Sequence, residues 1–228
     1  MNILAFDTSS EFLSIAATSD GKEIVEVDFE GKYQHAEQLI PLFEKAIKQA
    51  GFSIQETETI LIGSGPGSFT GLRVGFATVQ GLVAAQPLSV FSICSLDVVA
   101  QSFKSHSGVI AVVIDAHQGN IYTAIYESNC SGIQQKGEYA CISVEEAIET
   151  LKPYVDQGLI IVGNALRRYN QEFEAEFAKS LFVSEDFWYP RSKSLIDIYQ
   201  KRKDQLQPVL AHELLPFYMQ EPRLKKKS

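Results

Sequence analysis

Apolar and polar positions follow two different periods along the first hundred residues. Runs with strand-like spacing predict buried strands, at residues 3–6, 12–18 and 23–29. Ser19–Lys22 separates the last two with a hairpin-type turn, so the sheet begins with antiparallel pairing. Helical spacing then predicts a helix that ends at Ala50, with Gly51 as its C-terminal stop. This order of elements predicts an α/β fold.

A glycine-rich stretch, Gly63–Gly75, links the next apolar run to a predicted helix over residues 69–85. Strand, glycine loop and helix start commonly build an anion site, because free N–H groups and the helix dipole point the same way. However, neither the P-loop spacing nor G-x-G-x-x-G occurs here. A tight strand-to-helix turn, capped by Ser68 or Thr70, is therefore the favoured interpretation.

The helix after this loop has two unlike sides. One side carries large apolar residues suited to a core, namely Leu72, Phe76, Val79 and Val83. The other side is mostly small, with Gly71, Val74, Gly75, Thr78, Gly81 and Ala85. Two interpretations stay open at this point. The small side admits the close approach of a partner's helix, or both sides are buried within one domain.

The second half repeats the order of the first. An apolar run over residues 109–114 ends at Asp115, as the first run ends at Asp7. Further strands are predicted at residues 121–126, 135–142 and 159–162, with a capping box at Ser143–Glu146 before a helix. The predicted fold class is therefore α/β with two similar lobes. We expect an N-terminal lobe at residues 1–105 and a smaller or degenerate C-terminal lobe with its tail at residues 106–228.

The composition of the chain argues against several classes of function. The 228 residues carry a formal net charge of −8, which argues against a self-sufficient nucleic-acid binder. Three cysteines without a C-x-x-C pair predict free thiols in a reducing cytoplasm. No stretch is long enough to span a bilayer, so no membrane contact is expected. Lys225–Lys227 form a short basic end, which favours a solvated tail over a contact to RNA phosphate.

Few residues are candidates for catalysis or for binding a metal or nucleotide. Asp7 ends a strand where open α/β sheets bind ligands, so it could hold Mg²⁺ or a nucleotide. It could also cap the turn that follows, and this is the favoured interpretation. His35 lies near Glu37 without any HEXXH or HXXXH spacing, and no Ser lies in G-x-S-x-G. We therefore predict no catalytic residue, no cofactor and no metal site.

Several motifs in this order closely resemble the bacterial TsaB (YeaZ) family: residues 3–9, His35–Glu37, Gly65–Gly75 and Asp115–Ala116. The resemblance implies two lobes of the actin-like, sugar-kinase-like ATPase (ribonuclease H-like) fold. It implies a non-catalytic relative of TsaD that takes part in making N6-threonylcarbamoyladenosine beside the tRNA anticodon. TsaD would be the catalytic partner, TsaE the ATPase that joins them, and tRNA would be bound through the complex. A homodimer is expected as an option for the isolated chain.

The resemblance also implies which residues meet TsaD. Carried onto this chain, the pairing helices contribute His35, Leu39, Phe43, Thr70, Gly71, Val74, Gly75, Thr78 and Gly81. Leu39 stands four residues after His35, so the HXXXH metal pair of the catalytic relative has no counterpart. The chain departs from the family at Ala36, where Ser is common. It also carries His117 and Asn120 where the family often has Arg and Glu.

Three hypotheses remain. The first is a partner-dependent scaffold for tRNA modification, favoured by the glycine-loop helix and the missing catalytic groups. The second is an ATP-dependent small-molecule kinase or ATPase of the same superfamily, suggested by Asp7 and the glycine loop. The sequence after Asp7 lacks the Asp-x-Gly phosphate turn that this hypothesis needs. The third is a peptidase, for which no ligand or nucleophile motif is present.

Overall fold

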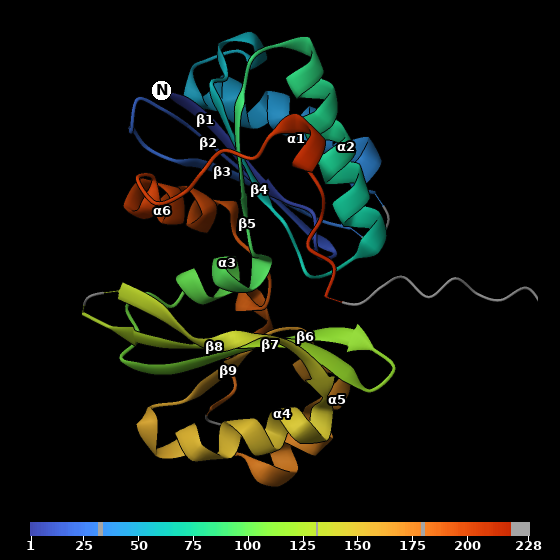
Figure 1. The fold of residues 1–228 in the computed structure, drawn as a ribbon, viewed down its shortest axis with the longest axis vertical. Helices are drawn as coiled ribbons and strands as arrows, with labels where there is room; N and C mark the ends of the chain where they lie inside the picture. The colour runs from blue at the N-terminus through green and yellow to red at the C-terminus, as the bar shows by residue number, and fades with distance from the viewer. Residues whose placement is uncertain (32–33, 131, 179–180, 220–228) are drawn as a thin grey trace, which may run out of the picture.

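Two lobes, each a β-sheet covered by helices, follow one another along the long axis of the molecule (Figure 1). The computed structural model describes residues 1–31, 34–130, 132–178 and 181–219. The basic end Lys225–Lys227, for which a solvated tail is favoured over a contact to RNA phosphate, lies outside these residues. The two sheets face each other across α3 (Ser95–Gln101), which contributes to the apolar clusters of both.

The first sheet has the strand order β3-β2-β1-β4-β5. Its strands are β1 (Asn2–Asp7), β2 (Phe12–Ser19), β3 (Val25–Glu30), β4 (Thr59–Gly63) and β5 (Ser89–Ile93). β1 pairs antiparallel with β2 and parallel with β4. Helices cover both faces of this sheet, which explains why the central strands are continuous apolar runs rather than alternating ones.

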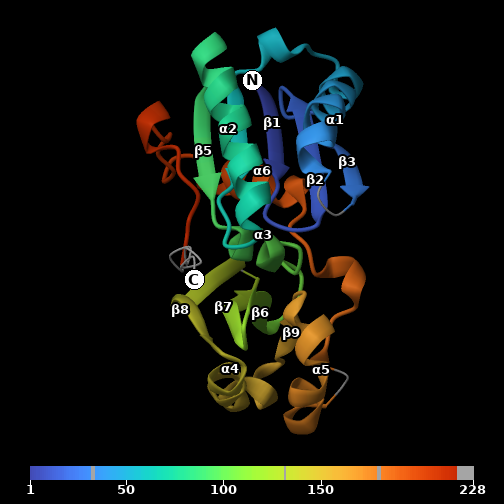
Figure 2. The same ribbon diagram turned by 90° about the vertical axis from the view of Figure 1, so that its right-hand side faces the viewer.

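Helices enclose the first sheet on both of its faces. α1 (His35–Ala50) and α2 (Phe69–Ala85) pack on one face and lie beside each other (Figure 2). α6 (Ser192–Arg202) packs with α3 on the opposite face. The large residues of α2 face the core as predicted. Leu72, Phe76 and Val79 are at most 3% exposed, and Val83 is half-buried against the same cluster.

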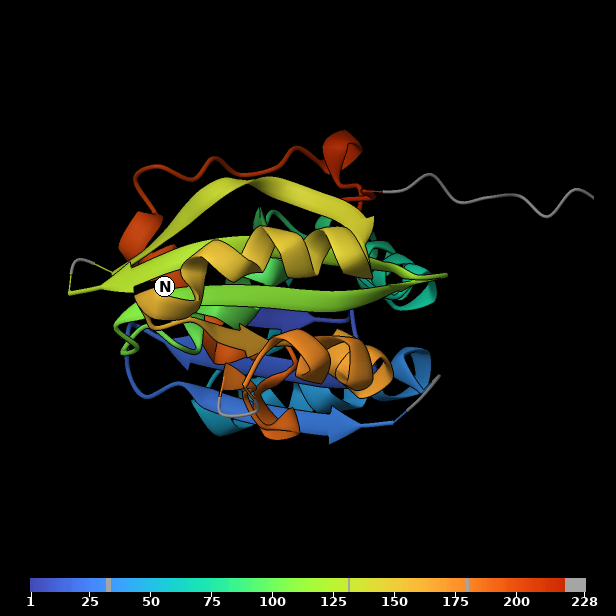
Figure 3. The ribbon, with the colours of Figure 1, turned by 90° about the horizontal axis from the view of Figure 1, so that it is seen from below.

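The second sheet has the order β8-β7-β6-β9, the same order as the first four strands of the first sheet. Its strands are β6 (Gly108–His117), β7 (Asn120–Asn129), β8 (Gly132–Ser143) and β9 (Ile160–Val162). α4 (Val144–Leu151) and α5 (Ala165–Glu176) cover the face that points away from the first lobe (Figure 3). Short 3-10 helices lie at Ile54–Glu56, Lys152–Gln157, Glu185–Phe187 and Ala211–Glu213.

The repeated strand order confirms the predicted α/β fold with two similar lobes. The capping box at Ser143 and Glu146 is also confirmed, with both reciprocal hydrogen bonds formed. The sheets lie on either side of the predicted boundary at residues 105 and 106, but α6 returns to the first sheet. The division into residues 1–105 and 106–228 therefore stays a prediction.

The chain after α6 forms a C-terminal strap, residues 206–218, along the first lobe (Figure 1). The Val209 N–H donates to the Val90 carbonyl at 2.7 Å, and Leu214 is 1% exposed within the first core. The Phe217 N–H donates to the Ser64 carbonyl at 2.8 Å, which joins the strap to the glycine loop. Sequence patterns predicted no element here, because apart from the short 3-10 turn at Ala211–Glu213 the strap is held by contacts with residues distant in sequence.

Candidate functional site

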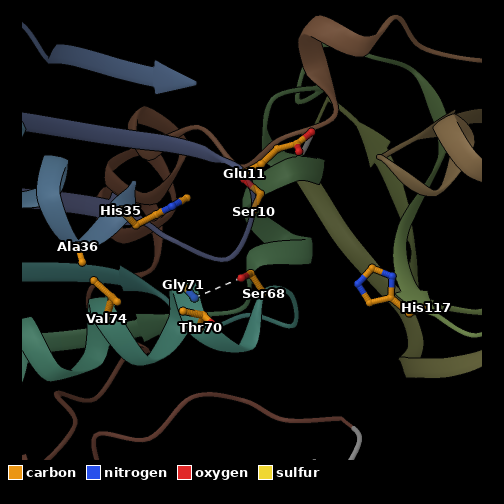
Figure 4. A pocket seen from close by; sticks show the side chains of 9 residues that line it. All are labelled: Ser10, Glu11, His35, Ala36, Ser68, Thr70, Gly71, Val74 and His117. Carbon is orange, nitrogen blue, oxygen red and sulfur yellow. Dashed lines mark hydrogen bonds between the residues drawn. The ribbon is translucent and has the colours of Figure 1, made fainter. Parts of the chain in front are cut away.

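Two neighbouring cavities open where the lobes meet, beside the start of α2. The larger, of about 590 Å³, lies between the lobes and includes Ser9, Ser10, Asp115 and Arg168 in its lining. The smaller, of about 330 Å³, lies between the starts of α1 and α2 (Figure 4). Its lining residues are Ser10, Glu11, His35, Ala36, Ser68, Thr70, Gly71, Val74 and His117.

Asp7 is buried beside these cavities, with 1% of the residue exposed. Its Oδ1 accepts the Ser9 N–H at 2.7 Å and its Oδ2 accepts the Ser95 hydroxyl at 2.6 Å. Gly63 contacts the carboxylate so closely that a Cβ there would overlap it. Burial raises the pKa of Asp7, and the bonds from Ser9 and Ser95 partly oppose this. The turn-capping interpretation of Asp7 is confirmed.

The start of α2 is held against the turn after β1. The Ser68 Oγ accepts the Gly71 N–H at 3.2 Å, so Ser68 rather than Thr70 caps the helix. The Ser68 N–H in turn donates to the Ser9 carbonyl at 2.6 Å. Gly71 lies against the Thr8 carbonyl, where a Cβ would overlap the oxygen. The glycine loop thus serves a close fit of backbone to backbone within the first lobe.

The three predicted partner residues of α1 lie inside the first lobe. His35, Leu39 and Phe43 are 7%, 1% and 2% exposed, and Phe43 packs on Phe6 with ring centroids 4.8 Å apart. Burial lowers the pKa of His35, opposed by a hydrogen bond to the Ser10 backbone. Within the described part of the chain, the His35 Nε2 has no hydrogen-bond partner. The role of these residues in pairing stays a prediction.

The outward face of α1 is formed by other residues of the same helix. Ala36, Ile40 and Glu44 recur at intervals of four and are exposed, Ile40 to 46%. The helical period that identified the core residues also predicts this exposed row. The resemblance points instead to buried positions of the same helix.

The predicted residues of α2 divide into two groups. Gly71 and Gly75 are buried, and a Cβ on Gly75 would lie 2.5 Å from the Thr8 Oγ1. Their missing side chains therefore serve packing within the lobe. Thr70 and Gly81 are exposed, and Val74 and Thr78 are half-buried. Burial within the lobe therefore applies to Gly71 and Gly75, whereas Thr70 and Gly81 remain accessible to a partner's helix. Partner binding itself stays a prediction.

The second lobe repeats the Asp7 turn at Asp115. The Asp115 Oδ1 accepts the His117 N–H at 2.7 Å, and its own N–H donates to the Asn164 Oδ1 at 2.9 Å. The side chain is 14% exposed and faces Arg168 at 3.4 Å from Oδ2. The predicted correspondence between Asp115 and Asp7 is therefore seen in the hydrogen bonds.

Arg167 joins the two lobes across the larger cavity. Its guanidinium forms ion pairs with Glu11 of the first lobe and with Glu185, and the Tyr189 hydroxyl donates to Glu11 at 2.7 Å. The bonds to Glu185 and Glu11 raise the pKa of Arg167. No motif in the sequence marks Arg167 or Ser95. The signal for Arg167 is topological, since Arg167 follows Gly163-Asn164, the turn after β9, as the glycine loop follows β4.

The charged groups of the cleft are thus largely paired with one another. Among the described residues, no three His, Cys, Asp or Glu side chains cluster closely enough to ligate a metal. Nor is any helix in the described ranges both long and apolar enough to cross a bilayer. The lining of the cleft includes serine and threonine hydroxyls and the paired Arg167 and Arg168. The Asp7 carboxylate is hydrogen-bonded to Ser9 and Ser95 and is buried.

The sequence of this chain is similar to those of proteins of tRNA modification. The family described as TsaD, tRNA N6-adenosine threonylcarbamoyltransferase, matches residues 30–197. The Escherichia coli tRNA threonylcarbamoyladenosine biosynthesis protein TsaB is 30% identical over 166 residues, 72% of this chain and 71% of that protein. Its Bacillus subtilis namesake is 24% identical over 96% of this chain and 94% of that protein. YeaZ from Pseudomonas aeruginosa shares the fold, with a TM-score of 0.80 at 24% identity over 96% and 99% of the two chains.

Proposed function

Because the chain belongs to the TsaB (YeaZ) family of tRNA threonylcarbamoyladenosine biosynthesis proteins, we propose that it is the non-catalytic scaffold that pairs with catalytic TsaD. The burial of Asp7 carries this proposal. Its two oxygens are bonded to Ser9 and Ser95, and the residue is 1% exposed. A metal or nucleotide at the sheet edge would need that carboxylate turned toward the cleft.

The pairing surface in this proposal is formed by the outward faces of α1 and α2. Ile40 is 46% exposed on α1, and Ala77 and Gly81 are exposed on α2. Apart from its chain neighbours and the backbone of its own helix, no atom of the described residues lies within 4 Å of the position that a Gly81 Cβ would take. Small residues on an exposed helix face let a partner's helix approach closely, which strengthens dispersion contacts.

The remaining assignments follow from the family role. TsaE would join the pair as an ATPase, and tRNA would be bound through the complex. The isolated chain could use the same surface to form a homodimer. The cysteines Cys94, Cys130 and Cys141 are not joined in disulfides, which suits the reducing cytoplasm where we place this activity.

The test is co-purification with TsaD of the same cell, followed by sizing of the mixture. Gly81→Arg and Ala77→Arg place a long cation on the proposed surface without entering the core, so we expect them to weaken pairing at least tenfold. Ala175→Arg is the matched control, since Ala175 is exposed on α5 of the second lobe. Gly75→Arg is unsuitable, because Gly75 is packed against Thr8.

Pairing that survives both α2 variants would contradict the proposed surface. The alternative function, an ATP-dependent kinase or ATPase, draws support from the cleft between the lobes with its two arginines. Calorimetry of the isolated chain with Mg-ATP separates the two. Tight binding together with turnover would overturn the scaffold proposal.

A further inference from the structure

The C-terminal strap brings two aromatic rings to the surface at the start of α2. Tyr218 packs on Phe69 with ring centroids 5.3 Å apart and planes inclined by 41°. The Arg73 guanidinium lies 3.8 Å from the Phe69 centroid. Phe217 packs edge-on against Tyr139 of β8, with centroids 5.7 Å apart. We call Phe69, Arg73, Phe217 and Tyr218 the aromatic surface.

The rings of this surface are partly exposed. Phe69, Phe217 and Tyr218 are 36%, 39% and 39% exposed. Large aromatic side chains contribute most to stability when buried, so a group of exposed rings joined by the contact of Tyr218 with Phe69 indicates a contact with another molecule. Phe69 also lines the cleft between the lobes, so the surface continues into that opening.

The charges around the aromatic surface indicate which kind of molecule would bind there. Among the described residues, no carboxylate lies within ion-pair distance of Arg73, whereas Arg167 and Arg168 are paired with acids. Four cations, Arg223 and Lys225–Lys227, occur in the last six residues, although the whole chain carries a net charge of −8. A cluster of positive charge therefore follows Phe217 and Tyr218 within ten residues of sequence.

We propose that the aromatic surface binds unpaired bases of RNA. Base faces stack on aromatic rings and guanidinium planes, and cations nearby neutralise the phosphates that follow each base. Bases within a duplex are already stacked, so an unpaired loop or end is the element that fits. This inference rests on the proposed role in tRNA modification and adds a direct contact between this chain and the tRNA.

The test measures anisotropy of a labelled tRNA transcript and of its isolated anticodon stem-loop. The full chain is used alone and together with TsaD. We expect Phe69→Ala and Tyr218→Ala to weaken binding about 5- to 150-fold, the range for loss of one stacked base. Tyr218→Phe keeps a ring and should bind like the wild type. Phe187→Ala is the matched control, because Phe187 is a 50% exposed ring in contact with Phe103 elsewhere.

Salt dependence provides a second measurement. Removal of residues 223–228 should lower the slope of log affinity against log salt by about 0.7 for each phosphate that these cations neutralise in the wild type. The inference is overturned if wild-type chain binds neither RNA in either setting, or if the Phe69 and Tyr218 variants bind RNA as the wild type does. It is also overturned if they lose TsaD but keep RNA, since the surface would then contact protein. Pairing with TsaD by the wild-type chain is measured separately, so the two proposals fail independently.

Discussion

Asp7 is the last residue of β1 and Asp115 lies two residues before the end of β6, and each carboxylate accepts the N–H of the residue two positions on. Their surroundings differ. Asp7 is 1% exposed and accepts a second bond from Ser95, at the start of α3. The Asp115 side chain is 14% exposed, opens on the cleft and meets Arg168 and His117.

This difference shows how the same kind of turn serves a different purpose in each lobe. In the first lobe the carboxylate joins β1, α3 and the glycine loop, because Ser95 also accepts the Gly65 N–H at 3.0 Å. In the second lobe the carboxylate lies at the surface and its ion pairs are exposed. A duplicated backbone therefore placed both acids alike, and their neighbours determined whether each is structural or accessible.

The largest effect is expected where the Asp7 turn is packed most tightly. Gly63→Ala inserts a Cβ into the space of the Asp7 carboxyl, so we expect a loss of about 3 kcal/mol or more in the free energy of unfolding. Urea denaturation at pH 7 measures it. The control is Gly81→Ala on the exposed face of α2, which should stabilise by up to about 1 kcal/mol. A tolerated Gly63→Ala would show that Asp7 is held loosely.

A direct comparison of the two turns comes from their supporting side chains. Ser95→Ala removes a donor from a buried carboxylate and should cost about 2–3 kcal/mol. Asn164→Ala removes the acceptor of the Asp115 N–H at a half-exposed site and should cost about 1 kcal/mol. Thermal and urea unfolding of both variants test the contrast. Equal losses would mean that the two turns are held alike.

The smallest effect concerns pH. Because burial raises the pKa of Asp7 above its ordinary value of 3.8, the folded chain keeps this proton over a range where the unfolded chain has lost it. The Asp7 contribution to stability therefore falls as the pH rises from about 4 through the folded pKa. Asp7→Asn removes this change, about 1.4 kcal/mol for each unit by which the pKa is raised.

Urea unfolding of both proteins at pH 4, 5, 6 and 7 measures the effect. The difference in unfolding free energy, wild type minus Asp7→Asn, should decrease toward pH 7. A difference that stays constant or grows would contradict the burial of an acid with a raised pKa at this position.

Periodicity along the chain was enough to predict the lobes, the turns at Asp7 and Asp115, and the buried stripe of Leu72, Phe76 and Val79. These features depend on contacts between neighbours in sequence or on simple inside-outside alternation. The candidate site was less predictable. Leu39 and Phe43 matched the family pattern, yet both lie in the core, because a helix pattern alone does not say which partner covers each face.

Sequence alone determined the α/β class, the duplicated order of elements and the family resemblance, since each is written in local runs of residues. Only the tertiary structure decided that Asp7 is bonded by Ser95, that Gly71 and Gly75 serve their own lobe, and that the strap brings Tyr218 to Phe69. Asp7 and Ser95 are 88 positions apart, Thr8 and Gly75 are 67 apart, and Phe69 and Tyr218 are 149 apart. Such contacts depend on how sheets and helices stack in space, which the spacing of residues along one segment does not encode.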